Sequence, residues 1–266
     1  MIPIQKPILE VSHLSHRFSD GGLGLDNICL KIAKGEFVVV AGHNGSGKTT
    51  LFRHLNGLLT PESGDVKVDG ISVSADVLRA RQMVGLVFQD ADSQIVGETV
   101  YDDAAFGPEN LCLNPVEVKR RVTSALSAVG MEHLAGQKPH RLSGGEKRRL
   151  AIAGILAMES QVLVLDEPFA NLDHAGMLQV LSRIAYLHRA GKTIILSTHD
   201  LDKTLGLAGR LILMKNGSII RDGAFEIVMR DAESAGVKMP CACRLEALYP
   251  DKGGPHAPCR DHDGLS

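Results

Sequence analysis

Short, continuously apolar segments recur along the chain and alternate with polar and helical stretches. The runs at strand length are residues 37–41, 84–88, 162–165 and 193–197. Runs of this kind are typical of parallel strands that are covered on both faces. Residues 8–18 and 25–32 alternate around a Gly-rich turn and predict an antiparallel pair. Residues 211–215 and 218–221 flank an Asn-Gly pair, which indicates a hairpin. The pattern predicts an α/β protein built around a parallel sheet.

Helical spacing fills the stretches between these strands. A helix is expected from residue 48 to about residue 57, directly after the first apolar strand. Asn114 followed by Pro115 predicts a helix start, and Gly130 is a suitable stop after an apolar face that repeats every three or four residues. A further helix is expected from Ser143 to about residue 158. The region between the second and third apolar strands is therefore predicted to be helical.

The composition changes near residue 231. The remaining stretch contains four prolines and three of the five cysteines, and it has no sustained apolar periodicity. We expect one folded domain over residues 1–230 and a short, loosely ordered extension over residues 231–266.

Composition and charge exclude several classes of protein. The 266 residues carry a formal charge of −2, contain no Trp and are 4% aromatic, which argues against nucleic-acid binding. No apolar run approaches the ~18 residues of a spanning helix, and the N-terminus lacks the apolar region of a signal peptide. Five scattered cysteines in a chain of this size indicate a reducing, cytosolic compartment.

A phosphate-binding loop follows the first apolar strand. The pattern G-x-x-x-x-G-K-[ST] is fitted by Gly42, His43, Asn44, Gly45, Ser46, Gly47, Lys48 and Thr49, and Thr50 continues into the helix. Glycines allow the backbone N–H groups to surround a phosphate, and the helix N-terminus adds positive potential. Lys48 is expected to reach the β- and γ-phosphates, and Thr49 is expected to bind Mg²⁺.

Two acids end the third apolar strand. Asp166 and Glu167 follow residues 162–165, so they lie at the carboxyl edge of the sheet, where open α/β folds bind ligands. Asp166 is suited to hold Mg²⁺ through water, and Glu167 to polarise an attacking water. This pair predicts hydrolysis in addition to binding.

A Gly-rich helix start occupies residues 142–146. Ser143 and Glu146 have the spacing of a capping box, which is the purely structural interpretation. Gly144 and Gly145 would be costly in a first helical turn unless the backbone approaches something closely. Exposed N–H groups and a hydroxyl at this end would also form an anion site.

These motifs in this order resemble the nucleotide-binding subunit of an ABC transporter, over roughly residues 8–225. The resemblance implies the ABC ATPase form of the P-loop NTPase fold. That fold has a RecA-like parallel sheet core, an antiparallel β subdomain, and a helical subdomain inserted at about residues 90–160. It also implies that Gln89 is the loop glutamine near Mg²⁺ and that His199 contacts the γ-phosphate. Phe18 falls where an aromatic ring stacks on adenine, although a core Phe on a first strand is nearly as good an interpretation.

The same resemblance implies that the chain acts in a pair, because the signature of one subunit (here Ser143, Gly144 and Gly145) closes over the ATP held by another. With one phosphate loop and one signature, this chain would form a homodimer or a heterodimer with a paralogue. ATP and Mg²⁺ are the expected ligands. Asp173 would belong to the dimer-contacting loop.

Residues 87–110 resemble the corresponding segment in the ATPases of energy-coupling-factor transporters, which import vitamins and cobalt or nickel ions. An acidic, solvated loop and helix is the alternative interpretation. The resemblance implies an integral membrane coupling subunit, a substrate-binding membrane subunit, and a peripheral position on the cytoplasmic face of the membrane. Cys241, Cys243, His256, Cys259 and His262 weakly favour a cobalt or nickel importer over a vitamin importer such as one for biotin.

A soluble ABC ATPase of DNA repair or translation is a competing interpretation. Repair members carry long coiled coils between phosphate loop and signature, whereas here about 93 residues without heptads separate Lys48 from Arg141. Translation members carry two cassettes. A third alternative, a sensor that binds nucleotide without turnover, conflicts with Glu167.

Overall fold

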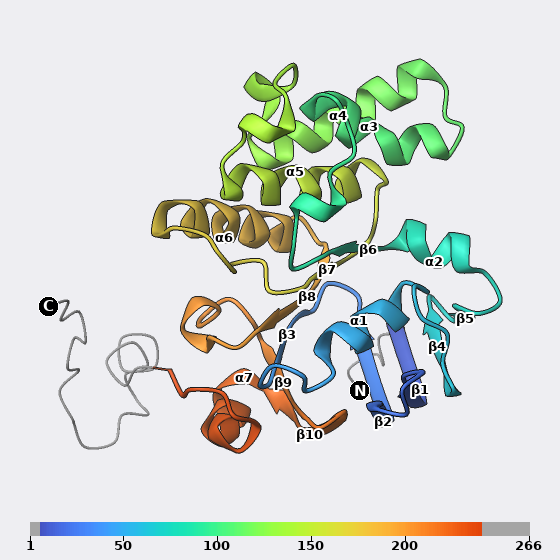
Figure 1. Cartoon of the computed structure of the whole chain (residues 1–266), viewed down its shortest axis with the longest axis vertical. Coiled ribbons are helices and arrows are strands. Elements are labelled where there is room, and N and C mark those ends of the chain that lie inside the picture. The colour runs from blue at the N-terminus through green and yellow to red at the C-terminus, as the bar shows by residue number, and fades with distance from the viewer. Residues whose placement is uncertain (1–5, 241–266) are drawn as a thin grey trace, which may run out of the picture.

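The computed structural model describes residues 6–240, which form two sheets joined through the core (Figure 1). The larger sheet has the strand order β10 (Ser218–Ala224), β9 (Arg210–Lys215), β3 (Phe37–Ala41), β8 (Thr193–Thr198), β7 (Val162–Leu165) and β6 (Val84–Val87). All its neighbours pair in parallel except β10 with β9. The smaller, antiparallel sheet has the order β2 (Leu23–Ala33), β1 (Pro7–Arg17), β4 (Ser63–Val68) and β5 (Ile71–Ser72).

Helices lie on both faces of the larger sheet. Helix α1 (Lys48–Leu55) and helix α2 (Val77–Met83) lie on the side of the antiparallel sheet, as Figure 1 shows. A separate group at the opposite end of the molecule contains α3 (Val100–Asn110), α4 (Pro115–Val129) and α5 (Gly144–Ala157). Helix α6 (His174–Arg189) lies between this group and the sheet, and α7 (Phe225–Val228) follows β10.

The apolar run of β3 is explained by burial on both faces. Phe37, Val39 and Ala41 contribute to the core that reaches the α3–α6 helices. Val38 and Val40 point into the second core, between the larger sheet, α1 and the antiparallel sheet. Alternate side chains of a strand point to opposite faces, so a strand covered on both sides has no polar position.

Local sequence signals set the helix ends. The Asn114 side chain accepts a hydrogen bond from the Glu117 N–H, Pro115 is the first helical residue, and Gly130 ends α4 in the left-handed conformation. Ser143 and Glu146 form a capping box at the start of α5. The predicted parallel strands, the β1–β2 pair and the β9–β10 hairpin are all present. The α/β class and the ABC ATPase architecture are confirmed.

The folded part extends beyond the boundary predicted at residue 230. A 3-10 segment, η5 (Met229–Ala235), buries Ala232 and Ala235, and Val237 is buried after it. The Ala235 carbonyl accepts a hydrogen bond from the His43 N–H at 3.1 Å, and Lys238 bridges in parallel to Asp200. The folded part therefore includes this segment, which contacts the phosphate loop at Ala235 and the residue after His199 at Lys238. The rest of the expected extension, with Cys241, Cys243, His256, Cys259 and His262, lies outside the described residues.

Candidate functional site

Most of the predicted site residues line one pocket of about 340 Å³ at the carboxyl edge of the parallel strands. The phosphate loop forms one wall, β1 and β2 contribute a second, and the ends of β6, β7 and β8 contribute the third. The predicted residues in its lining are Phe18, Asn44, Gly45, Ser46, Gly47, Lys48, Thr49, Thr50, Gln89, Asp166, Glu167 and His199. Residues from five separate regions of the chain thus converge.

The phosphate loop has a backbone that requires glycine. Gly45 and Gly47 have φ values of 81° and 104°. A Cβ on Gly47 would lie 2.9 Å from the Gly24 carbonyl oxygen. Lys48 is buried, and its Nζ donates hydrogen bonds to the carbonyl oxygens of Gly42 at 2.8 Å and His43 at 3.1 Å. Burial lowers the pKa of Lys48, and the charges of Glu167 and Asp166 oppose that shift.

Gly42 and His43 do not line the pocket. Their carbonyl groups hold Lys48, and the His43 N–H is bonded to Ala235. The His43 ring lies 2.6 Å from the Asn44 carbonyl oxygen, through Nδ1. Both residues shape the loop through their backbone.

Asp166 is held from two sides by hydroxyl groups. Thr49 Oγ1 donates to Asp166 Oδ2 at 2.6 Å, and Ser197 Oγ donates to Asp166 Oδ1 at 2.6 Å. The first contact joins the helix after the phosphate loop to the end of β7. Ser197 was not predicted from the sequence, and its only signal is a hydroxyl near the end of β8, which ends at the same sheet edge as Asp166.

Glu167 has a strained backbone and one unpaired oxygen. Its φ is 46°, and its N–H donates to Ser197 Oγ at 2.8 Å. Glu167 Oε2 lies 3.1 Å from His199 Nδ1, whereas Oε1 is buried without a hydrogen-bond partner. Non-glycine residues in this region of φ are uncommon and cluster at functional sites. The carboxylate is thus available to a group entering the pocket.

The signature residues lie apart from this pocket, at the start of α5. Ser143 and Gly144 are exposed, and Ser143 Oγ donates to Glu146 Oε2 at 2.9 Å. Gly145 is buried, and a Cβ there would lie 3.1 Å from the Gly176 Cα on α6. The close packing of α5 on α6 therefore favours a residue without a side chain at this position. Asp173 caps α6 through the Gly176 N–H at 2.8 Å.

Phe18 is 43% exposed at the pocket rim, with its ring edge-on to His16 at a centroid distance of 5.1 Å. An exposed ring beside a phosphate loop has a face free for stacking on a planar group. This geometry favours the binding interpretation over that of a core Phe.

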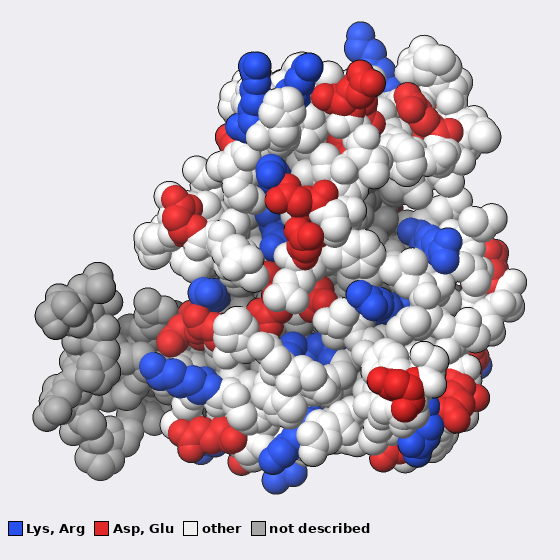
Figure 2. Space-filling view, in the orientation of Figure 1, with Lys and Arg blue, Asp and Glu red and all other residues white. Residues whose placement is uncertain are grey.

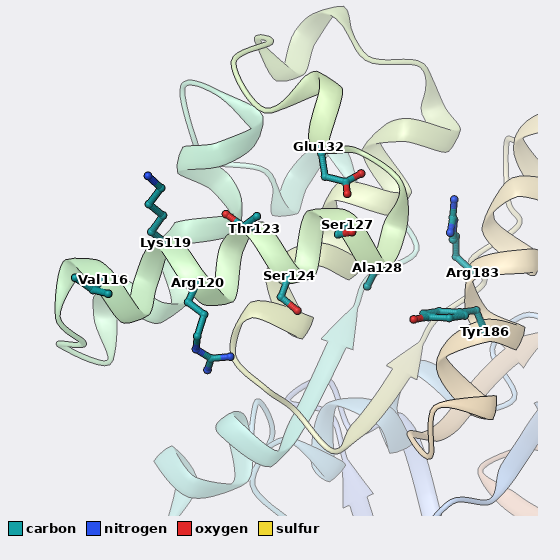
Figure 3. A pocket seen from close by; sticks show the side chains of 10 residues that line it. All are labelled: Val116, Lys119, Arg120, Thr123, Ser124, Ser127, Ala128, Glu132, Arg183 and Tyr186. Atoms are coloured by element: carbon teal, nitrogen blue, oxygen red, sulfur yellow. The ribbon is translucent and has the colours of Figure 1, made fainter.

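A larger hollow lies elsewhere, between α4 and α6 (Figure 3). Hydroxyl groups of Thr123, Ser124 and Ser127 line it, and none of the predicted site residues does. Charges on the face shown in Figure 2 are of both signs and interspersed. Among residues 6–240, no helix combines the length and the apolar character needed to cross a bilayer.

A phosphate loop between a buried strand and a helix, beside two acids at the edge of a parallel sheet, defines a P-loop nucleotide-binding protein. The sequence profile of ABC transporters matches residues 25–170. The chain belongs to this family, the ABC transporter ATPases. Its members bind and hydrolyse ATP.

Within this family, the chain is similar to ATP-binding proteins of energy-coupling factor and cobalt import transporters. The energy-coupling factor transporter ATP-binding protein EcfA of Methanocaldococcus jannaschii is 44% identical over 90% of this chain and 88% of its own length. The cobalt import ATP-binding protein CbiO of Syntrophus aciditrophicus is 46% identical over 83% of this chain and 80% of its own.

The structure resembles that of CbiO1 from Clostridium perfringens, part of the ABC transporter complex CbiONQ. The TM-score is 0.80, with 36% identity, covering 92% of this chain and 97% of the other. A cassette solved as a dimer in a post-hydrolysis state with ADP and Pi gives a TM-score of 0.72 at 26% identity, covering 81% and 98%.

Proposed function

We propose that this chain is the ATP-hydrolysing subunit of an energy-coupling-factor importer. The observation that carries the proposal is the convergence of Lys48, Thr49, Asp166, Glu167 and His199 in one pocket. A phosphate loop alone would support binding. The added carboxylate and imidazole support turnover.

The donor set beside Thr49 suits Mg²⁺. A threonine hydroxyl and the Asp166 carboxylate lie side by side, and Gln89 lines the same pocket, so the available ligands are the hard oxygens that Mg²⁺ prefers. When bound, Mg²⁺ would neutralise charge on the phosphate oxygens. Thr49 and Asp166 would hold it, and Ser197 would fix the orientation of Asp166.

Hydrolysis then rests on positioning and charge. The phosphate loop and Lys48 hold the phosphates of ATP, and Phe18 stacks on its base. Glu167, with its unpaired Oε1, accepts a hydrogen bond from the attacking water, and His199 orients Glu167 through the 3.1 Å contact. In-line attack breaks the bond to the γ-phosphate and yields ADP and phosphate.

A pair of chains completes the site. Ser143 and Gly144 are exposed at a helix N-terminus and do not line the pocket of their own chain. They are placed to contact ATP held by a second chain, either a copy of this one or a paralogue. The dimeric cassette among the similar structures supports this arrangement.

The proposed cargo is a cobalt or nickel ion, and the proposed position is peripheral, on the cytoplasmic face of the membrane. The name of the CbiO relative, cobalt import ATP-binding protein, supports the cargo. Vitamin import by the same class of transporter is the alternative, because the EcfA relative carries no solute in its name. A membrane coupling subunit and a substrate-binding membrane subunit are the expected partners.

The surface proposed for the coupling subunit is a second hollow beside the Gln89 segment, lined by Val96, Glu98, His140 and Lys147 among others. Val96 is 62% exposed. Phe106, ten residues later on α3, is 54% exposed. Exposed apolar side chains in a polar rim are typical of protein interfaces.

The acids of α3 serve the fold. Asp102 forms the capping box with Thr99, and Asp103 is buried and accepts hydrogen bonds from the N–H groups of Val96 and Gly97. Asp102 caps α3 and Asp103 holds the loop that precedes it, so charge reversal at these two positions would mainly disturb the local fold.

Hydrolysis is tested with Glu167→Gln. ATP binding should persist, because Lys48 and the loop are unchanged, while turnover should fall about 10²–10⁴-fold. Calorimetry and phosphate release measure the two effects, and Lys48→Ala, which should weaken binding itself, is the comparison. Wild-type turnover by Glu167→Gln would reject the role of this residue.

The membrane partner is tested by co-purification. Val96→Asp and Phe106→Asp should each reduce retention of the coupling subunit and leave ATPase activity of the isolated chain intact. Val116→Asp, on an 81% exposed site of α4, is the matched control. Full retention by both variants would remove this surface from the interface. Uptake of Co²⁺, Ni²⁺ or biotin by the reconstituted complex identifies the cargo, and absence of any membrane partner would favour a soluble ABC ATPase.

A further inference from the structure

A buried arginine joins the signature helix to the loop that carries Gln89. Arg148, one turn into α5, is only 4% exposed. Its Nη1 donates to the Phe88 carbonyl oxygen, and its Nη2 donates to the Gln89 carbonyl oxygen at 2.7 Å. The planar guanidinium therefore holds two successive peptide groups, including that of Gln89 itself.

The same loop is closed by contacts of its own. Gln94 Nε2 donates to the Leu86 carbonyl oxygen at 2.9 Å, and the Phe88 N–H donates to Gln94 Oε1 at 3.1 Å. Lys147, beside Arg148, forms an ion pair with Asp92 at 2.6 Å. Two adjacent cations of α5 thus hold both ends of a closed loop. The loop and the start of α5 are expected to move together.

Burial makes this connection rigid. Arg148 Nε is buried without a hydrogen-bond partner, so the contacts from Nη1 and Nη2 to the two carbonyl groups are the hydrogen bonds that hold this buried guanidinium. Burial lowers the pKa of Arg148, whereas the charges of Asp90, Asp166 and Asp92 favour the charged form. Breaking either carbonyl contact leaves a buried charge short of partners, which is strongly unfavourable.

We propose that Arg148 is a positioning residue that couples the two nucleotide sites of the paired protein. It would transmit the position of Ser143 and Gly144, which face the ATP of the second chain, to Gln89 in the pocket of its own chain. The inference rests on the proposed function, which assigns those two places to the two sites. When ATP binds in the pocket of the second chain, the signature residues that contact it would move. This movement would shift the Gln89 peptide in the pocket of the chain that carries the signature.

The adjacent arginine provides a matched control. Arg149 is also buried, at 9% exposure, but its Nη1 contacts Gln179 on α6. Its side chain carries the same charge on the same helix, but its hydrogen bond goes to α6 and not to the Gln89 loop. Replacement of either arginine by Met removes a buried guanidinium of equal size. Only Arg148→Met removes the connection to Gln89.

The experiment measures loop opening and turnover in the full-length chain. Amide hydrogen exchange of residues 88–94 should accelerate at least about tenfold in Arg148→Met, because two hydrogen bonds to a charged group are lost. The rate kcat should fall about 10–100-fold, as for other residues that orient a ligand-binding group, with little change in ATP affinity. Arg148→Lys, which can still donate to one carbonyl, should recover part of both losses.

Arg149→Met should leave exchange in residues 88–94 at the wild-type rate, even if it lowers thermal stability. Equal acceleration in both variants would mean a general loosening of α5 and would overturn the proposal. Wild-type exchange and kcat in Arg148→Met would overturn it too. If Arg148→Met does not fold, the comparison is made between Arg148→Lys and Arg149→Lys, with the same readouts. Absence of ATPase activity in the wild-type chain would instead reject the proposed function, independently of the exchange data.

Discussion

Ser197→Ala tests how the carboxylates of the site are held. Ser197 is fully buried, donates to Asp166 Oδ1 at 2.6 Å and accepts from the Glu167 N–H at 2.8 Å. Removal of the hydroxyl leaves one carboxylate oxygen and one N–H without these partners. A hydrogen bond to a charged group contributes about 1.5–3 kcal/mol, and an unsatisfied N–H costs about 1–3 kcal/mol. The free energy of unfolding should therefore fall by about 2.5–6 kcal/mol.

For a chain of this size, each kcal/mol lowers Tm by about 2–4 °C. The expected decrease in Tm is about 5–24 °C, measured by calorimetry. Ser160→Ala is the control, because Ser160 is also fully buried and its hydroxyl donates only to the Gln82 carbonyl oxygen at 2.9 Å. Loss of that neutral bond should cost about 1 kcal/mol.

Turnover provides a second readout for Ser197→Ala. The kcat should fall about 10–100-fold because Asp166 loses one of the two hydroxyls that orient it. ATP affinity should change little, since Ser197 does not line the pocket. If Ser197→Ala lowers Tm no more than Ser160→Ala and leaves kcat unchanged, the orientation of Asp166 does not depend on this hydroxyl and the reasoning is refuted.

Further outcomes are expected at the phosphate-loop helix. Burial, with the charge of His16 adding to it, lowers the pKa of His54 to about 4. Below about pH 6.5 the unfolded chain takes up a proton that the folded chain does not, so stability falls from pH 6.5 to about 4, by up to about 3 kcal/mol. His54→Leu should flatten this slope in urea unfolding, whereas exposed His140→Leu should retain it. Gly47→Ala should abolish ATP binding in calorimetry, because φ is 104° and the Gly24 carbonyl lies too close; unchanged affinity would contradict that.

The helix ends, the parallel strands and the phosphate loop can be predicted from the sequence because each depends on residues that are close together in the chain. Asn114 with Pro115, and Ser143 with Glu146, cap their helices through neighbours within three residues. The apolar runs of the parallel strands and the glycines of the phosphate loop are also local patterns. Their conformations depend on nearby backbone geometry, so no knowledge of distant contacts is needed.

Distant contacts explain what the sequence does not reveal. Arg148 belongs to a Lys-Arg-Arg run, which usually indicates a solvated surface, yet it is buried and donates hydrogen bonds to carbonyl groups about 60 positions earlier. Ser197 is one of three hydroxyl residues in β8, and its role depends on contacts with the neighbouring strand. The packed segment at Ala232 and Ala235 follows a 3-10 repeat of three residues, which the search for helical or strand periodicity does not detect.

The position of β3 has a consequence for biosynthesis. This strand, wholly apolar and central in the sheet, pairs with β8 and β9, and Phe37 lies opposite Ile194, which follows it by 157 positions. At about 5–20 residues per second, the ribosome needs about 8–30 s to supply those partners. During that interval the nascent chain carries an unpaired apolar strand, the kind of segment that aggregates or recruits a chaperone. The strand that presents the phosphate loop is thus among the first synthesised and among the last to be enclosed.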